Sequence, residues 1–465
     1  FKKKKKKQKK IKLILYISFT CIWLTSCKKF IDIPPPSYQL GSDKVFTSDG
    51  TATSAVTGIY SEMMLNQNQF SNSAITLYSG LYADEMTYYS SSDRDEFINS
   101  SLSQSSHPFL STAFWSPAYR YIYAANICIE KLENATGISP VLRNRLLGES
   151  KFIRAFCFFY LTELFDGVPL TVTSDYKNNQ NLGRSPYTEV LDQVIADLKE
   201  AKNLLPEQYA GTERIRPNKW AAASLLARTY LYSGKWQEAK RETDEILNSN
   251  LYRLSPLLNN VFLKGSNETI WQLQPVNPNW NTWEGKEILF ETTIVPPTFI
   301  LRESLVHSFE TGDKRKDSWI ASRIYMDDNV YYPYKYKVYG NNAPVTENYV
   351  VFRLAEIYLI RAEAKLNLKD YPGASEDINL IRTRAGLQNV NIPDEQALRE
   401  ALIAERRHEL FAEWGHRFFD LKRWMMVDGV MKALKPSTWD SFRARWPIPY
   451  NQINTNSNLL QNPGY

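Results

Sequence analysis

The chain has 465 residues, of which 43% are hydrophobic, 23% charged and 13% aromatic. This length allows a large buried core, and the ordinary apolar share excludes a disordered chain, a collagen-like fibre and a polytopic membrane protein. Four cysteines exclude a disulfide-rich scaffold. Aromatic residues are the unusual feature, with 28 Tyr, 22 Phe and 12 Trp. A surplus of Tyr suits amphipathic contact surfaces better than catalysis.

The net charge of +6 originates at the amino-terminal end. Residues 1–26 contain nine lysines and no acidic residue, so removing them leaves the rest of the chain with a net charge of −3. A chain with this balance gives no support for nucleic-acid binding.

The basic run leads into twelve apolar residues, 13–24 (LILYISFTCIWL). A helix needs roughly 20 apolar residues to cross a bilayer core, whereas twelve is the length of the hydrophobic region of a signal peptide. Leu24-Thr25-Ser26-Cys27 follows and resembles a bacterial lipobox. An ordinary secretory signal with a chance cysteine is the alternative.

We therefore predict a lipoprotein signal peptide over residues 1–26 and lipidation of Cys27. Residues 27–40 are expected to form an extended tether, because three consecutive prolines in this stretch cannot lie inside a helix. The residue after Cys27 is Lys28, not the Asp associated with inner-membrane retention, which favours the outer membrane.

Apolar residues spaced by three and four predict helices over residues 118–132 and 142–165. The second is expected to stop at residues 166–169 (DGVP), where Gly suits a helix end and Pro blocks continuation. A further helix is predicted over residues 186–205. Cys128 and Cys157 lie in these apolar runs and are predicted to be buried thiols, with a disulfide between them as the alternative.

Residues 222–246 and 354–381 resemble each other. Aligned on Ala239 and Ala374, small Ala227 matches Ala362, and an aromatic residue precedes each alignment point by three. This spacing resembles tetratricopeptide-type helix pairs, in which alanine lets two antiparallel helices approach closely. We predict two such pairs within a helical scaffold.

Two blocks have a different composition, residues 78–116 and 251–351. Both are rich in Tyr and in turn-forming residues, and the second adds four Trp and β-type composition. We expect loop-rich recognition surfaces there, because loops tolerate change where packed helices do not.

The sequence contains no phosphate-binding loop, dinucleotide fingerprint or nucleophile elbow. His408-Glu409 does not complete a zinc motif, because position 412 is Ala, and no metal or other cofactor is expected. Paired carboxylates can hydrolyse glycosides without a sequence signature, so Asp84-Glu85 and Asp327-Asp328 keep a glycosidase open as an alternative. Surface solvation or calcium ligation is the commoner explanation of such pairs.

Residues 404–424 (AERRHELFAEWGHRFFDLKRW) mix charges of both signs with aromatic residues. On one helix Arg406 would face Glu409, and Glu413 would precede Arg417 by four, which is the spacing of stabilising ion pairs. A buried charge needs a partner, so we interpret this stretch as structural rather than catalytic.

Four separated blocks together resemble the SusD/RagB-like family of outer-membrane nutrient-binding lipoproteins. They are the lipobox with residues 30–34, residues 148–170, residues 353–386 with 405–424, and the ending from Trp446-Pro447-Ile448-Pro449 to Tyr465. The blocks span nearly the whole chain after the signal peptide, in the order expected for the family.

The resemblance implies a mainly α fold: a single domain with tetratricopeptide-like helix pairs and a loop-rich, partly β portion. Its expected bounds are 41–465, with an amino-terminal part of about 41–250 and a carboxyl-terminal part of about 251–465. The family binds oligosaccharides or other nutrients at the cell surface, without catalysis. It delivers them to a TonB-dependent, SusC-like transporter. The expected location is the outer membrane, lipid-anchored and facing the exterior.

Ligand contacts in this family are not encoded by a motif, so the candidates come from physical reasoning. Sugars present CH faces and hydroxyl edges, which suit aromatic rings beside planar polar groups. The candidates lie in three groups: Tyr88, Tyr89, Asp93 and Arg94; Asn279, Trp280, Asn281 and Trp283; and Tyr331 and Tyr332. The alternative for each aromatic is packing within its own loop or against the transporter. A lipid-anchored glycosidase and a helical-repeat assembly scaffold remain the alternative functions.

Overall fold

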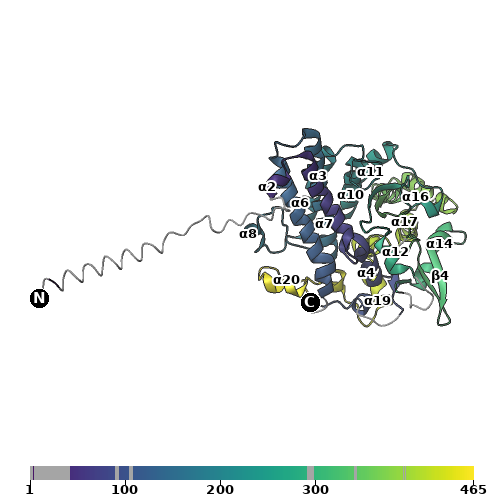
Figure 1. Cartoon of the computed structure of the whole chain (residues 1–465). Coiled ribbons are helices and arrows are strands. Elements are labelled where there is room, and N and C mark those ends of the chain that lie inside the picture. Colours follow the sequence, from purple (N-terminus) through teal and green to yellow (C-terminus); the bar gives the residue numbers. More distant parts are fainter. Residues whose placement is uncertain are drawn as a thin grey trace.

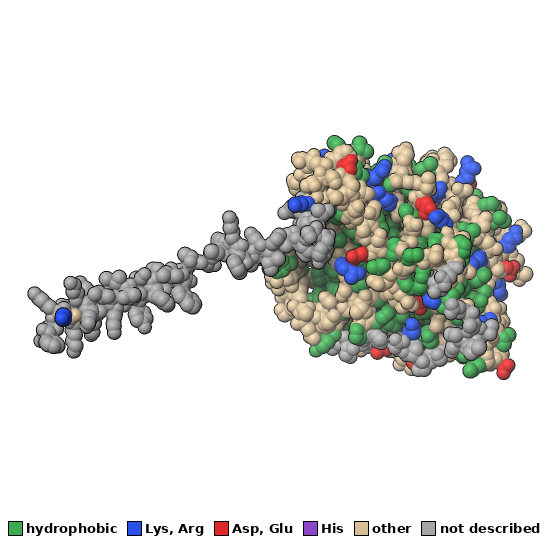
Figure 2. Space-filling model, in the orientation of Figure 1, with side chains coloured by type: hydrophobic (Ala, Val, Ile, Leu, Met, Phe, Trp, Pro, Cys, Tyr) green, Lys and Arg blue, Asp and Glu red, His purple; other side chains and the backbone are tan. Residues whose placement is uncertain are grey.

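The computed structural model describes residue 4 and residues 42–89, 94–103, 108–290, 298–339, 343–390, 392 and 394–465. The predicted signal peptide (1–26), the lipidation site Cys27, most of the tether (27–40) and the candidate Asp93 lie outside the described residues. In the described ranges, no helix combines the length and the apolar character needed to cross a bilayer. Charged and apolar side chains are interspersed over the face shown in Figure 2.

Helices dominate the structure (Figure 1), which confirms the predicted mainly α fold. The longer helices pack largely against their neighbours in the chain, α6 on α7, α7 on α9, α9 on α10 and α10 on α11, after which α11 packs on α15 and α15 on α16. Their bounds are α3 (Asp49–Leu65), α6 (Ser116–Glu133), α7 (Pro140–Phe165), α9 (Tyr187–Leu204), α10 (Lys219–Tyr232), α11 (Trp236–Asn248), α15 (Leu354–Asn367), α16 (Tyr371–Ala385) and α17 (Glu395–Leu410).

The helices predicted over residues 118–132, 142–165 and 186–205 correspond to α6, α7 and α9. Helix α7 ends where Asp166 adopts a φ of 66°, as the turn residues indicated. The predicted helix pairs are α10 with α11 and α15 with α16, and Ala227 and Ala362 are completely buried within them. Small side chains at these positions therefore let the helices pack closely.

Shorter elements connect the long helices, and among the described residues three antiparallel two-stranded sheets lie between them. Strand β1 (Met86–Thr87) pairs with β3 (Ile300–Leu301), β2 (Thr269–Leu273) with β6 (Tyr349–Arg353), and β4 (Ile320–Tyr325) with β5 (Asp328–Pro333). The short helices are α2 (Ser42–Val45), α4 (Ile75–Tyr82), α5 (Asp95–Ile98), α8 (Tyr176–Asn179), α12 (Trp283–Ile288), α13 (Glu303–Val306), α14 (Lys314–Trp319), α18 (His416–Arg423), α19 (Val427–Leu434) and α20 (Tyr450–Thr455).

The expected loop-rich block 78–116 is wrong at both ends. Tyr78 and Tyr82 belong to α4 and are almost completely buried, and residues 110–115 form a π-helical turn that leads into α6. The aromatic residues that suggested an exposed surface are instead core residues at these ends.

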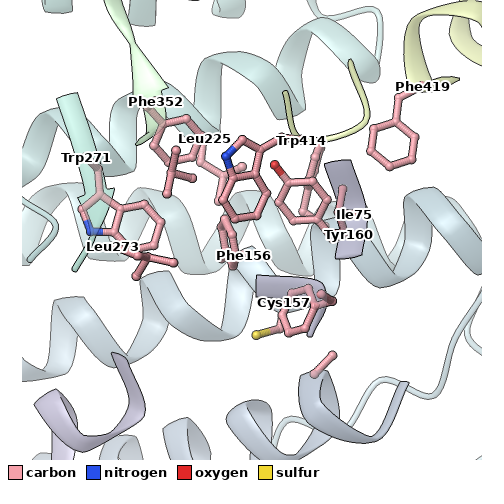
Figure 3. Close-up of a cluster of buried hydrophobic side chains, with 14 of the residues drawn as sticks. Ile75, Phe156, Cys157, Tyr160, Leu225, Trp271, Leu273, Phe352, Trp414 and Phe419 are labelled. Atoms are coloured by element: carbon pink, nitrogen blue, oxygen red, sulfur yellow. The ribbon is translucent and has the colours of Figure 1, made fainter. Parts of the chain in front are cut away.

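Aromatic side chains fill the centre of the core (Figure 3). Phe156 and Tyr160 of α7 lie 5.5 and 5.4 Å, between ring centroids, from Trp414, and Phe156 also contacts Trp271 of β2. Cys157 belongs to the same cluster. It and Cys128 are buried free thiols, so the alternative of a disulfide between them is wrong.

The charged stretch 404–424 is structural, but its ion pairs differ from those predicted. Helix α17 ends at Leu410, and Ala412, Trp414 and Gly415 all adopt positive φ before α18 begins at His416. The break separates Glu413 from Arg417, so that predicted pair does not form. Arg406 and Glu409 both lie in α17, but each binds other partners.

Glu413 and Arg417 have partners outside this stretch, whereas Arg406 pairs within it. Glu413 binds Lys335 and Arg353, Arg417 binds Asp84, and Arg406 binds Asp420. Each of these charges is buried and compensated across the core, as the cost of burying an unpaired charge requires.

Candidate functional site

A cleft of about 460 Å³ opens between the β1–β3 sheet and strand β5. We call it the β5 cleft. It is lined by Thr87, Tyr89, Ile300, Leu301, Arg302, Glu303, Ser304, Asp328, Asn329, Val330, Tyr331 and Leu434.

One wall of the β5 cleft is the short β1–β3 sheet. Met86 pairs with Leu301 and Thr87 with Ile300, and the backbone N–H of Arg302 donates to the carbonyl oxygen of Glu85 at 2.9 Å. Buried Met86 and Leu301 anchor the two strands in the core. The wall is therefore held by packing and backbone hydrogen bonds beneath the cleft.

The other wall is the β4–β5 hairpin, which extends from the helical body beside α14 (Figure 1). Its two-residue turn is Met326-Asp327, with φ values of 46° and 71°. Positive φ at both central residues is the geometry of a type I′ turn, whose twist matches the flanking strands. Alternation along β5 then sends neighbouring side chains to opposite faces.

The two candidates on β5 have different surroundings. Tyr331 lines the cleft, and Asn329 donates to its hydroxyl at 3.0 Å. Tyr332 does not line the cleft and packs against Phe290, with ring centroids 5.2 Å apart. The structure thus brings Tyr331, and not Tyr332, to the cleft.

Tyr89 connects the two walls. Its ring meets that of Tyr325 edge to face at 4.8 Å, and its hydroxyl donates to the carboxylate of Asp328 at 3.2 Å. Desolvation and this hydrogen bond both raise the pKa of Tyr89. The ring is therefore held by the hairpin and stays neutral at physiological pH.

Arg302 supplies a cation at the cleft wall. Its guanidinium makes no hydrogen bond within the part of the chain that the structure describes. Burial lowers the pKa of Arg302, partly offset by the charge of Asp84. A half-buried cation with free N–H groups favours an oxygen acceptor on a ligand.

Two other candidates lie on a neighbouring cluster rather than in the cleft. The Arg94 guanidinium lies 5.1 Å from the centroid of the Tyr88 ring and 5.6 Å from that of Phe299. Both distances are in the range of cation–π attraction. Tyr88 and Arg94 are half-buried.

The group around Trp280 is split between surface and core. Asn279 is exposed and Trp280 half-buried, but Trp283 and Asn281 are only 8% and 2% exposed. The indole N–H of Trp283 donates to the carbonyl of Met64, and Asn281 accepts from the backbone N–H of residues 346 and 347. The expected exposed position is therefore wrong for Trp283 and Asn281, whose polar atoms are used within the fold.

Sequence reasoning did not place Arg302, Asn329 or Ser304 at the site. Asp328 was considered only as one half of a carboxylate pair. The available signal was the polar stretch Asp327-Asp328-Asn329 between two alternating strands, which marks a hairpin turn.

The other carboxylate pair has a structural explanation. Asp84 accepts from Arg417 at 2.8 Å and from Arg407 at 3.1 Å. Glu85 is 2% exposed, and burial together with the charge of Asp84 raises its pKa to about 8. Neither carboxylate lines the β5 cleft.

Comparison with known proteins gives consistent matches over almost the whole chain. The model of the SusD family matches residues 233–465, and a second family model, described as "Starch-binding associating with outer membrane", matches residues 29–231. Both halves contribute to the β5 cleft, since Thr87 and Tyr89 lie in the first and Arg302 and Tyr331 in the second.

Individual relatives agree with these matches. SusD-like protein P25 of Formosa agariphila is 25% identical over 97% of this chain and 98% of its own length. A SusD superfamily structure from Bacteroides vulgatus has a TM-score of 0.80 at 22% identity, covering 90% of this chain and 99% of its own. A laminarin-binding SusD-like protein has a TM-score of 0.75 at 23% identity, covering 90% of this chain and 100% of its own.

Proposed function

The chain belongs to the SusD family, and from this membership and the β5 cleft we propose that it binds oligosaccharides at the cell surface and passes them to a TonB-dependent, SusC-like transporter. The observation that carries the proposal is the meeting of Tyr89 and Tyr331 with Asp328, Asn329 and Arg302 in one cleft. Rings offer flat apolar faces to sugar CH groups, while the planar polar groups reach hydroxyls.

The ligand is bound and not cleaved. In a hydrolase two carboxyl groups flank the scissile bond, one as acid and one as base or nucleophile. In the β5 cleft Asp328 already accepts a hydrogen bond from Tyr89, and Glu303 is exposed on the other wall. The names of the relatives describe starch-binding and laminarin-binding proteins, which supports a glycan as the ligand class.

A lipid on Cys27 would hold the protein at the outer membrane. Each buried CH₂ of an acyl chain contributes about 0.8 kcal/mol, and stable anchoring takes more than one chain. Replacing Cys27 by Ser is expected to abolish incorporation of radiolabelled palmitate and to release the protein from the membrane fraction. Unchanged labelling would contradict the anchor, and failure to co-purify an outer-membrane barrel would contradict the transporter partner.

The binding test compares Tyr331, which lines the β5 cleft, with its neighbour Tyr332, which does not. Affinities for laminarin, maltoheptaose and other glycans are measured on the full chain in a detergent without a sugar headgroup. Tyr89→Ala and Tyr331→Ala are each expected to weaken binding about tenfold, equivalent to about 1.4 kcal/mol. Tyr332→Ala is the matched control, because it removes the same ring from the opposite face of β5.

The outcome decides between the alternatives. Equal losses for Tyr331→Ala and Tyr332→Ala would contradict the β5 cleft as the site. Release of shortened sugars during incubation would support the glycosidase, and retention of protein partners without any glycan binding would support the assembly scaffold.

A further inference from the structure

A second cleft, of about 480 Å³, lies beside α20, at the end of the molecule away from β4 (Figure 1). We call it the α20 cleft. It is lined by Trp115, Ser116, Tyr119, Pro169, Thr171, Asn179, Gln180, Gln452, Thr455, Asn456 and Leu459.

The floor of the α20 cleft is aromatic. Trp115 and Tyr119 lie one helical turn apart, with ring centroids 5.0 Å apart, and Trp115 meets Phe165 edge to face at 5.2 Å. The hydroxyl of Tyr119 donates to the carbonyl of Pro169 at 2.8 Å, which fixes its ring. These rings are rigid before any ligand arrives, so little conformational entropy is lost on binding.

The rim of the α20 cleft offers free amide groups. Gln180 is exposed and its side chain makes no hydrogen bond within the described residues. Asn179 uses its amide nitrogen on the carbonyl of Thr173, and Gln452 directs its nitrogen to Ser111 at a long 3.4 Å. The amide oxygens of Asn179 and Gln452 receive no hydrogen bond from any described residue, so they can accept from a ligand.

All residues that line the α20 cleft are uncharged. The β5 cleft differs, because Arg302, Glu303 and Asp328 line it. Uncharged polar and backbone atoms likewise surround the position of α20 on the face shown in Figure 2. The α20 cleft therefore suits a neutral, hydroxyl-rich ligand, because it has an aromatic floor, a rim of amide groups and no charged residue in its lining. A charged ligand would lose hydration without gaining an ionic partner.

We propose that the α20 cleft is a second carbohydrate-binding site, selective for uncharged oligosaccharides and separate from the β5 cleft. The proposal rests on the proposed glycan-binding function. The half-buried ring of Tyr119, backed by the buried ring of Trp115, forms its platform, and Gln180, Asn179 and Gln452 bind sugar hydroxyls. Because the two sites share no residue, the effects of substitutions in them are expected to be additive.

The test measures binding of laminarihexaose and maltoheptaose to the full chain in the same detergent. Gln180→Ala is expected to weaken the affinity of the α20 cleft for these oligosaccharides about three- to tenfold, and to leave binding in the β5 cleft unchanged. Asn178→Ala is the matched control, because Asn178 is an exposed residue of α8 two positions before Gln180 and does not line the cleft. Thr455→Trp, at an exposed rim position, is expected to fill the α20 cleft and abolish binding there.

Hydrogen exchange locates the site independently of the variants. Saturating oligosaccharide is expected to slow exchange in residues 450–459 and 171–180, and Gln452→Glu is expected to reduce this protection by adding a charge. A glucan that carries carboxylates, used at the same concentration, is expected to give no protection there.

The possible results separate the two clefts. If Tyr89→Ala abolishes all binding while Gln180→Ala matches Asn178→Ala, the α20 cleft is refuted and the proposed function stands. If the Gln180 and Thr455 variants lose binding while Tyr89→Ala retains it, the α20 cleft stands and the β5 cleft is refuted. If the unmodified chain binds neither laminarihexaose nor maltoheptaose, the proposal of a binding site in the α20 cleft is refuted. Binding of other glycans would still support the proposed function.

Discussion

Replacing Glu409 by Gln tests the buried charge network that joins α17 to the rest of the core. Glu409 is completely buried, and its carboxylate accepts from Arg353 at 2.5 Å, from Arg315 at 3.1 Å and from Arg384. Burial by itself raises the pKa of a carboxyl group, but the charges of these arginines outweigh burial and hold the pKa of Glu409 well below its usual range.

The expected loss of unfolding free energy depends on which ion-pair partners each arginine keeps after the substitution. Removing one member of a buried ion pair costs roughly 3–5 kcal/mol. After the substitution Arg315 still contacts Asp313, and Arg353 and Arg384 still contact Glu268. Because no guanidinium loses its only partner, we expect the lower end of the range, about 3 kcal/mol of unfolding free energy.

The assay is urea unfolding followed by tryptophan fluorescence and by far-ultraviolet circular dichroism, whose coincidence checks for a two-state transition. Glu400→Gln on the exposed face of α17 is the control and is expected to change stability by less than about 0.5 kcal/mol. The stabilisation by a carboxylate with a depressed pKa is complete above its unfolded pKa of about 4.3 and is lost progressively as the pH falls from there toward the folded pKa, so the loss at pH 5 is expected to be close to that at pH 7. A Glu409 variant as stable as the control would refute the reasoning.

Three further predictions concern the walls of the β5 cleft and its surroundings. Met326→Gly is expected to raise stability by up to about 1 kcal/mol, because Met326 is 74% exposed and adopts a φ of 46° that Gly adopts freely; a lower thermal midpoint would contradict this. Trp283→Ala is expected to cost about 3–5 kcal/mol of unfolding free energy, and a loss no greater than that of Trp280→Ala would place Trp283 at the surface instead. Stabilisation by neutral Glu85 is complete below its unfolded pKa of about 4.3 and is lost as the pH rises toward about 8, so Glu85→Gln is expected to flatten the fall in stability between pH 5 and pH 8.5 measured by urea unfolding.

Local patterns predicted much of the helical scaffold. Apolar spacing located α6, α7 and α9, because a helix buries one face at a fixed period whatever lies against it. The end of α7 was predicted from Gly167 and Pro169. The helix pairs could also be predicted from local sequence, because the close approach of two helices depends on a few small side chains such as alanine.

Partners of charged residues could not be predicted in this way. The pairing of Glu413 with Arg417 assumed a continuous helix, but residues such as Ala412 and Trp414 adopt positive φ, which their types disfavour. Tertiary packing imposes this break and sends Glu413 to Arg353 instead. The burial of Trp283 and Asn281 could not be predicted either, because composition does not show which side of a loop packs against the core.

By itself the sequence therefore determined much of the helical scaffold and which family the chain resembles, and it predicted contact surfaces made of aromatic residues with polar neighbours. Only the tertiary structure decided which of those residues share a cleft. Tyr89 and Asp328 are 239 residues apart in the chain and are joined by one hydrogen bond, because the β1–β3 sheet and the β4–β5 hairpin meet there. Such contacts depend on how distant segments pack, and local periodicity carries no record of that packing.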